Sequence, residues 1–220
     1  MIGARVLPSS TQEIGQDIFD NRLWQDRMSA IGSGQPPGIA IAWARIDESV
    51  APRGRRALRQ RQRETADRLA RERLAARADH AEAKWRLVRD AVGRPVAVGR
   101  NDRPGPAMSI AHSGALVALA ISDIGPVGID VEDRRRVRDF RAIATSYFSA
   151  DDATLVERGG APVFYRLWTA YEATLKLDPV GERGFERRHW EVGGYTLCLA
   201  WLATRSEIVS EGIKDRPSET

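Results

Sequence analysis

Alternating apolar and polar positions predict strands at several places along this chain of 220 residues. Between residues 39 and 46, Ile39, Ile41 and Trp43 fall on one face of such a strand. The same pattern predicts strands at 96–98, 108–114, 116–121 and 127–132, and one or two closing strands at 190–203. The short connection between 116–121 and 127–132 predicts that these two strands are hairpin-like neighbours.

A second pattern, with apolar residues every three or four positions, predicts helices. The longest follows a break at 52–54 and ends at Gly93, with Pro95 just beyond. Further helices are predicted at 140–148, after a capping Ser149, and at 164–177, beyond a Gly-Gly-Ala-Pro break. The apolar positions of the longest helix are Ala66, Ala70, Leu74, Ala78, Ala81, Trp85, Val88 and Val92.

Two strand-then-helix blocks predict an α+β fold of two comparable halves. We place them at 1–106 and 107–203, followed by a polar tail at 204–220. No run of about 18 apolar residues suggests a membrane span, and the N-terminus lacks the apolar centre of a signal peptide. We therefore expect a cytoplasmic protein, and we expect its single cysteine, Cys198, to be a buried strand residue.

The charge pattern points to an anionic partner. Lys and Arg total 34 against 30 Asp and Glu, and only three of the basic residues are lysines. An arginine-rich chain with a pI near 9.6 suits nucleic acid, phosphorylated small molecules or an acidic protein. Arginines crowd residues 53–63, but acidic residues interrupt the patch further along. A solvated helix with internal salt bridges is therefore favoured over nucleic-acid binding.

The candidate chemistry lies in two segments. Asp130 and Glu132 fall on one face of a strand, ~7 Å apart, and Trp168, Glu172 and Lys176 share one helical stripe spanning ~12 Å. Three carboxylates brought together suit a magnesium ion, which completes its shell with water and substrate phosphates. Taken singly, the strand pair could be a solvated face, and the helix pair an ordinary salt bridge.

A histidine lies in a third segment, Ile-Ala-His-Ser-Gly. His112 alone is consistent with a structural residue at a strand end. Ser113 lacks the Gly-x-Ser-x-Gly context of a hydrolase nucleophile, because Ala111 and Ala115 stand where glycines belong. The sequence therefore offers no persuasive covalent nucleophile.

The order of these segments resembles the surfactin-type 4'-phosphopantetheinyl transferases, which convert carrier proteins from the apo to the holo form. The resemblance is close over residues 93–177. Its motifs are Gly93-Arg-Pro95, Ser109-Ile-Ala-His-Ser-Gly114, Val127-Gly-Ile-Asp-Val-Glu132 and Phe164-Tyr-Arg-Leu-Trp-Thr-Ala-Tyr-Glu-Ala-Thr-Leu-Lys176. It implies a pseudo-dimeric fold, with coenzyme A and Mg²⁺ in the cleft between two similar halves.

The resemblance also implies roles for individual residues. Asp130, Glu132 and Glu172 would hold Mg²⁺, and Glu172 would accept the proton of the carrier's serine. Lys176 and His112 would take part in catalysis and contact the phosphates of coenzyme A. The remaining expected coenzyme A contacts are Trp168, Arg94, Arg61 and Arg68.

Two positions depart from the family pattern. Tyr171 stands where the family often has lysine, and Ala111 where it often has serine. These departures keep open a coenzyme A-binding relative without transferase activity. The expected partner is an apo acyl or peptidyl carrier protein of secondary metabolite biosynthesis, acted on by a monomer. We expect an acidic carrier to dock on the arginines of residues 134–138 and on the predicted helix at 140–148.

Overall fold

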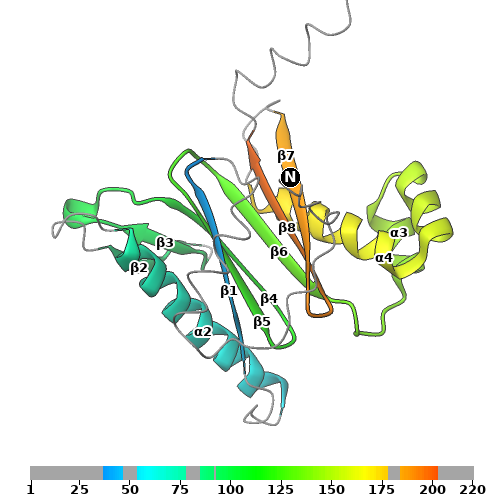
Figure 1. The fold of residues 1–220 in the computed structure, drawn as a ribbon, viewed down its shortest axis with the longest axis horizontal. Coiled ribbons are helices and arrows are strands. Elements are labelled where there is room, and N and C mark those ends of the chain that lie inside the picture. Colours follow the sequence, from blue (N-terminus) through cyan, green and yellow to red (C-terminus); the bar gives the residue numbers. More distant parts are fainter. Residues whose placement is uncertain (1–36, 47–53, 78–84, 92, 178–183, 203–220) are drawn as a thin grey trace, which may run out of the picture.

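The computed structural model, shown in Figure 1, describes residues 37–46, 54–77, 85–91, 93–177 and 184–202. The polar tail predicted at 204–220 lies outside the described residues, as does the part of the predicted long helix at 78–84. The described residues form a mixed fold of helices and antiparallel sheets, which agrees with the predicted α+β class. They include no helix long and apolar enough to cross a membrane.

The first three-stranded sheet is built around a fully buried strand. β5 (Leu116–Ser122) pairs antiparallel with β1 (Ile39–Arg45) on one side and with β4 (Ala107–Ser113) on the other. Helix α2 (Arg55–Ala76) lies against this sheet through Leu69, Ala70 and Leu74. The predicted strands at 39–46, 108–114 and 116–121 are therefore confirmed.

The second three-stranded sheet has the order β6-β8-β7, and all its pairs are antiparallel. Its strands are β6 (Val127–Asp133), β7 (Phe185–Val192) and β8 (Tyr195–Leu202). Between β6 and β7 the chain forms α3 (Phe140–Tyr147) and α4 (Ala150–Leu175). Helix α4 begins at a Ser149 cap, as predicted, and is interrupted at Gly160, where φ is 67°.

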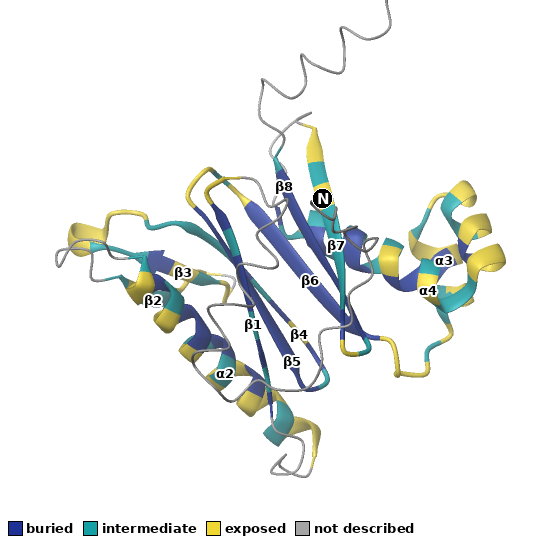
Figure 2. Ribbon diagram, viewed as in Figure 1, coloured by how far each residue is buried: buried dark blue, intermediate teal, exposed yellow. Residues whose placement is uncertain are grey.

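The hydrophobic core lies between the two sheets, with a helix on the outer side of each (Figure 2). One buried cluster joins Ile41 and Ala118 of the first sheet to Ile129, Leu197 and Leu199 of the second. Helix α4 covers the other face of the second sheet, where Cys198 is fully buried as predicted. The residues that alternate with this core therefore point toward α2 or α4.

A seam of serine hydroxyls joins the two sheets. The backbone N–H of Ile129 donates to Ser109 Oγ at 3.0 Å, and that of Asp133 donates to Ser113 Oγ at 3.1 Å. Both serines lie on β4 and both donors on β6, so these strands run parallel and in register without sharing a ladder. β4 and β6 are thus the strands along which the sheets meet.

The predicted long helix is wrong in its second half. Helix α2 ends at Ala76, and the apolar residues beyond the undescribed stretch form β2 (Arg86–Arg89), which pairs with β3 (Pro95–Val98). Gly93, with φ of 82°, belongs to the turn between these strands instead of ending a helix. A 3₁₀ turn follows at Arg100–Asp102. Trp85 and Leu87 pack beside Leu69 and Leu74, so tertiary packing overrides the helical spacing.

The predicted pairing of 116–121 with 127–132 is also wrong. β5 pairs with β1 and β4, whereas β6 pairs with β8, so the short connection at 123–126 crosses from one sheet to the other. β4 and β5, which follow the predicted boundary at 106/107, share a sheet with β1.

Candidate active site

The two acidic residues of β6 are buried and point away from the central core. Asp130 is 8% exposed and Glu132 9% exposed, so the solvated strand face that remained open from the sequence is not what the fold provides. Val127, Ile129 and Val131, which alternate with them, fill the core between the sheets. The strand is covered on both sides, and its carboxylates face α4 and the seam.

Lys176 neutralises Asp130. Its Nζ donates to Asp130 Oδ1 at 2.8 Å and to the carbonyl of Ile129 at 2.9 Å, while Asp130 Oδ2 is buried without a hydrogen-bond partner. Burial raises the pKa of Asp130 to about 6, the charges of Glu132 and Glu172 raise it as well, and Lys176 opposes the shift. Lys176 therefore pairs across elements, in place of the pair with Glu172 that helical spacing allowed.

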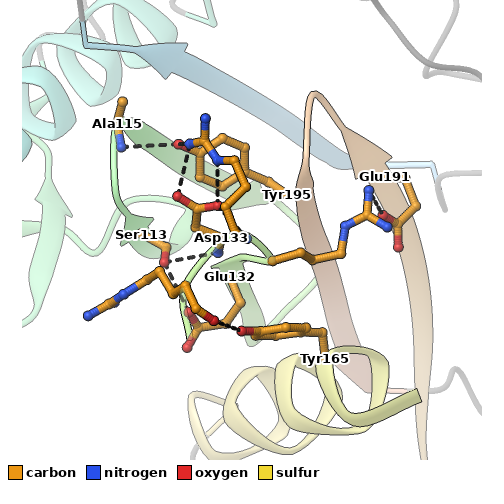
Figure 3. A network of polar contacts seen from close by, with 10 residues as sticks. Ser113, Ala115, Glu132, Asp133, Tyr165, Glu191 and Tyr195 are labelled. Atoms are coloured by element: carbon orange, nitrogen blue, oxygen red, sulfur yellow. Dashed lines mark hydrogen bonds and ion pairs between the residues drawn. The ribbon is translucent and has the colours of Figure 1, made fainter. Parts of the chain in front are cut away.

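Glu132 receives donors at both of its oxygens. Oε2 accepts from Arg138 Nη2 at 2.8 Å and from Ser113 Oγ at 2.9 Å, and Oε1 accepts from Trp168 Nε1 at 3.2 Å. The donors come from the loop after β6, from β4 and from α4. Figure 3 shows Ser113 between Glu132 and the backbone of Asp133. Trp168 thus lies in the site, where it bonds a carboxylate.

Glu172 completes the acidic group from α4. It lies one turn before Lys176 and is half-buried, and its carboxylate makes no hydrogen bond or ion pair with the described residues. Its negative charge is nevertheless one of the causes that raise the pKa of Asp130. The structure therefore brings the three predicted metal ligands into one neighbourhood.

The donor set fits a hard divalent cation, although the side chains as they stand do not form a closed metal cage. Among the described residues, no group of three His, Cys, Asp or Glu side chains is arranged to hold an ion directly. Instead, Lys176 and Arg138 neutralise the carboxylates. The unbonded, buried Oδ2 of Asp130 is the atom that a cation would satisfy, because a buried carboxylate oxygen without a partner carries a desolvation cost.

His112 lies near the end of β4, where the charge of Lys176 acts on it. The residue is exposed as a whole, but its ring is partly buried. This partial burial is the main cause that lowers the pKa of His112. The positive charges of Lys176, Arg59 and Arg63 lower the pKa further. The charges of Lys176, from the second half of the chain, and of two arginines of α2 therefore act on His112.

The three arginines that are expected to contact coenzyme A all lie at the surface. Arg61 and Arg68 are exposed, and Arg68 lies 3.7 Å from Glu72 in an exposed pair. Arg94 is exposed at the β2–β3 turn, where its backbone N–H bonds Asp90. The arginines whose charges act on His112 are Arg59 and Arg63, for which the sequence predicted no role. Their four-residue spacing, flanking the buried Gln62, was the signal that could have identified them.

A second network holds the β4–β5 turn against the second sheet (Figure 3). Tyr195 Oη accepts from the backbone N–H of Ala115 at 3.2 Å and from Arg135 Nη2 at 2.8 Å. Arg135 also bonds both oxygens of Asp133, at 2.8 and 2.9 Å. A Cβ on Gly114, where φ is 53°, would lie 2.9 Å from Asp133 Oδ2. This network fixes the turn that follows His112 and Ser113.

Tyr171 belongs to an aromatic cluster. Its ring centroid lies 5.8 Å from that of Trp168, 6.2 Å from Tyr147 and 6.4 Å from Phe148. The position where the resemblance expected a lysine is therefore used to join α4 to α3, and Tyr147 remains more than half exposed at the edge of the cluster. Ala111 is buried in the core between the sheets, on the opposite face of β4 from His112.

The predicted docking arginines are mostly paired within the chain. Arg134 forms an ion pair with Glu191, Arg135 bonds Asp133, and Arg138 bonds Glu132. Arg136 has an exposed side chain, and its carbonyl accepts from Tyr165 Oη at 2.8 Å, which ties the loop to α4. The loop is therefore a structured part of the site's wall as well as a basic surface.

A cavity of about 220 Å³ lies elsewhere, between α2 and the first sheet. Arg73 and Arg77 line it together with apolar residues of β1 and β5. None of the predicted site residues lines this cavity, so it is separate from the acidic group.

Comparison with known proteins finds relatives for the second half of the chain. Residues 126–200 match the family model of the 4'-phosphopantetheinyl transferase superfamily. A 72-residue stretch is 35% identical to the 4'-phosphopantetheinyl transferase AcpT of Salmonella typhi and of Salmonella typhimurium, covering 31% of this chain and 38% of each relative. A 96-residue stretch is 30% identical to a Synechocystis protein named provisionally as a 4'-phosphopantetheinyl transferase, covering 42% of this chain and 39% of that protein.

The alignments thus span about two fifths of the length of these relatives. The matched segment runs from the start of β6 to β8 and contains the buried carboxylates, α4 and Lys176. Residues 126–200 are accordingly similar to the 4'-phosphopantetheinyl transferase superfamily.

Proposed function

We propose that the protein transfers the 4'-phosphopantetheine arm of coenzyme A to a serine of an apo carrier protein, with Mg²⁺, and releases 3',5'-ADP. The observation that carries the proposal is the buried carboxylate pair of Asp130 and Glu132 with the half-buried Glu172 and Lys176, inside the segment that matches the superfamily. Asp130 Oδ2 is buried and has no hydrogen-bond partner, as expected of a ligand that is complete only with its cation.

The chain's own residues account for the steps of transfer. Glu172 accepts the proton of the serine hydroxyl, and the serine oxygen forms a bond to the β-phosphorus of coenzyme A as the bond to 3',5'-ADP breaks. A divalent cation at the carboxylates would neutralise charge on the leaving diphosphate oxygen. Lys176 and His112 contact the diphosphate from opposite sides of the seam.

In this mechanism the 3'-phosphate of coenzyme A binds to arginines of α2. Arg59 and Arg63 supply positive charge beside His112, so we favour them over Arg61 and Arg68. An anion placed between these arginines would offset the positive charges that help to lower the pKa of His112. Arg94 stays a predicted contact.

The pseudo-dimeric fold belongs to the same proposal. The sheet orders β1-β5-β4 and β6-β8-β7 both place the last strand of a half between its first and its middle strand. A long helix follows the first strand in each half. We therefore place the division between the halves after β5, at residues 123–126, instead of at 106/107. Action as a monomer in the cytoplasm, in secondary metabolite biosynthesis, stays a prediction.

Incubation with coenzyme A, Mg²⁺ and a panel of apo carrier proteins tests the function, with the added arm detected by mass. We expect transfer to at least one carrier and its loss in Asp130→Ala. Asp123→Ala, which removes an exposed carboxylate paired with Arg77, is the matched control and should retain transfer. Coenzyme A binding without transfer to any carrier would instead identify a binding protein without transferase activity.

A further inference from the structure

We propose that Arg138 is a positioning residue that holds Glu132 in the cation-free protein and competes with the divalent cation for it. The inference rests on the proposed function, because it takes Glu132 as a cation ligand. Arg138 Nη2 lies 2.8 Å from Glu132 Oε2, and the two side chains are 21% and 11% exposed. The ion pair is therefore largely shielded from water at the site itself.

Arg138 differs from its neighbours in the basic loop. The side chains of Arg134 and Arg135 are 38% and 51% exposed, and their partners are Glu191 and Asp133. The partner of Arg138, by contrast, is the predicted cation ligand Glu132. Arg138 also directly precedes Asp139, whose side chain caps α3 by accepting from the N–H of Ala142. Its backbone is thereby anchored where its guanidinium reaches inward.

The donors around Glu132 set Arg138 against a cation. A carboxylate has about four lone-pair positions, and Glu132 uses three of them for Arg138, Ser113 and Trp168. A divalent cation at Oε2 would meet a guanidinium on the same oxygen, and the two positive charges repel each other strongly in a site that excludes water. Binding of the cation at Oε2 therefore requires Arg138 to leave, and a cation at the remaining position of Oε1 is opposed by the same positive charge.

The exchange has a functional consequence. In the cation-free site, Lys176 and Arg138 offset most of the charge of Asp130, Glu132 and Glu172. A cation that arrives alone displaces Arg138 without giving it a new partner. A cation that arrives with a diphosphate supplies both the replacement charge and an anion for the released guanidinium. The cation and its anionic co-substrate should therefore bind better together than separately.

Titration of the full-length protein with Mn²⁺ in the absence of coenzyme A tests the competition, with free Mn²⁺ measured by electron paramagnetic resonance. Mn²⁺ prefers oxygen ligands as Mg²⁺ does. We expect Arg138→Ala to bind Mn²⁺ about three- to tenfold more tightly than the wild type, because a partly buried ion pair no longer opposes binding. Arg136→Ala removes the same charge from the same loop without touching Glu132, so it should change the affinity less than about twofold.

Equal affinities in Arg138→Ala and the wild type, or weaker binding in Arg138→Ala, would overturn the inference. Thermal unfolding of each variant verifies folding, and Arg138→Gln, which keeps a donor but no charge, replaces the alanine variant if that variant unfolds. If the wild type transfers the arm yet Arg138 has no effect on Mn²⁺ affinity, the inference alone fails. If the wild type binds neither Mn²⁺ nor coenzyme A, the proposed function fails and this inference fails with it.

Discussion

Gly128 is the point at which α4 touches β6, and a single methyl group there should separate them. A Cβ on Gly128 would lie 1.9 Å from the carbonyl oxygen of Ala173 and 3.3 Å from Cβ of Lys176. Ordinary contact begins at 3.4 Å, so the helix would have to move by about 1.5 Å. Both colliding groups are backbone or Cβ atoms, so no change of rotamer relieves the clash.

We expect Gly128→Ala to lower the free energy of unfolding by about 3 kcal/mol, at the upper end of overpacking costs. The displaced helix also carries Lys176 and Glu172, so the 2.8 Å bond between Lys176 and Asp130 should break and transfer should fall below detection. Urea denaturation measures the first effect and the carrier assay the second. A Cβ on Gly184 would meet no atom within 4 Å, so Gly184→Ala is the control. Equal stability of the two variants would refute the close approach.

Two further predictions concern the same half of the chain. Because burial raises the pKa of Asp130 from 3.8 to about 6, the folded protein binds a proton that the unfolded chain releases between pH 4 and 6. The free energy of unfolding of the metal-free wild type should therefore fall by about 3 kcal/mol as the pH rises through this window, and Asp130→Asn should lack that fall. Urea denaturation at several pH values measures both proteins, and an equal dependence of stability on pH in the two would contradict the prediction. Tyr171→Ala should lower stability by about 2 kcal/mol, because the ring contacts with Trp168, Tyr147 and Phe148 are lost. Tyr171→Phe should unfold at the same urea concentration as the wild type, and a loss as large as that of alanine would assign the stabilisation to the hydroxyl.

The acidic part of the site could be predicted because its signals are local. The period of two puts Asp130 and Glu132 on one face of β6, and the four-residue spacing puts Trp168, Glu172 and Lys176 on one stripe of α4. These relations depend only on the type of element. The order of motifs then added the family resemblance, which the match of residues 126–200 supports.

The pairing of strands far apart in the sequence could not be predicted, because the local sequence pattern fitted other structures equally well. Trp85 and Val88 fit a helical stripe, but the turn at Gly93 lets β2 pair with β3, and Trp85 and Leu87 pack, partly buried, against the cluster that contains Leu69 and Leu74 of α2. A short connection suggested that β5 and β6 pair, whereas β5 is already paired with β1 on one edge and β4 on the other. A central strand has no free edge, and spacing along the chain does not show which strands are central.

The seam between β4 and β6 explains why the site needs both sheets. Ser109 and Ser113 accept backbone donors of β6, and Ala111 between them is small and buried in the shared core. Since side chains alternate along a strand, this inward set forces His112 to the opposite face of β4, where Lys176 and two arginines of α2 act on it. The same alternation on β6 turns Asp130 and Glu132 away from the core.

Ser113 then links the two strands directly, because its hydroxyl accepts from the N–H of Asp133 and donates to Glu132. Sliding the seam by one residue would move His112 into the core and the serines out of it, so the register that holds the sheets together also assembles the site.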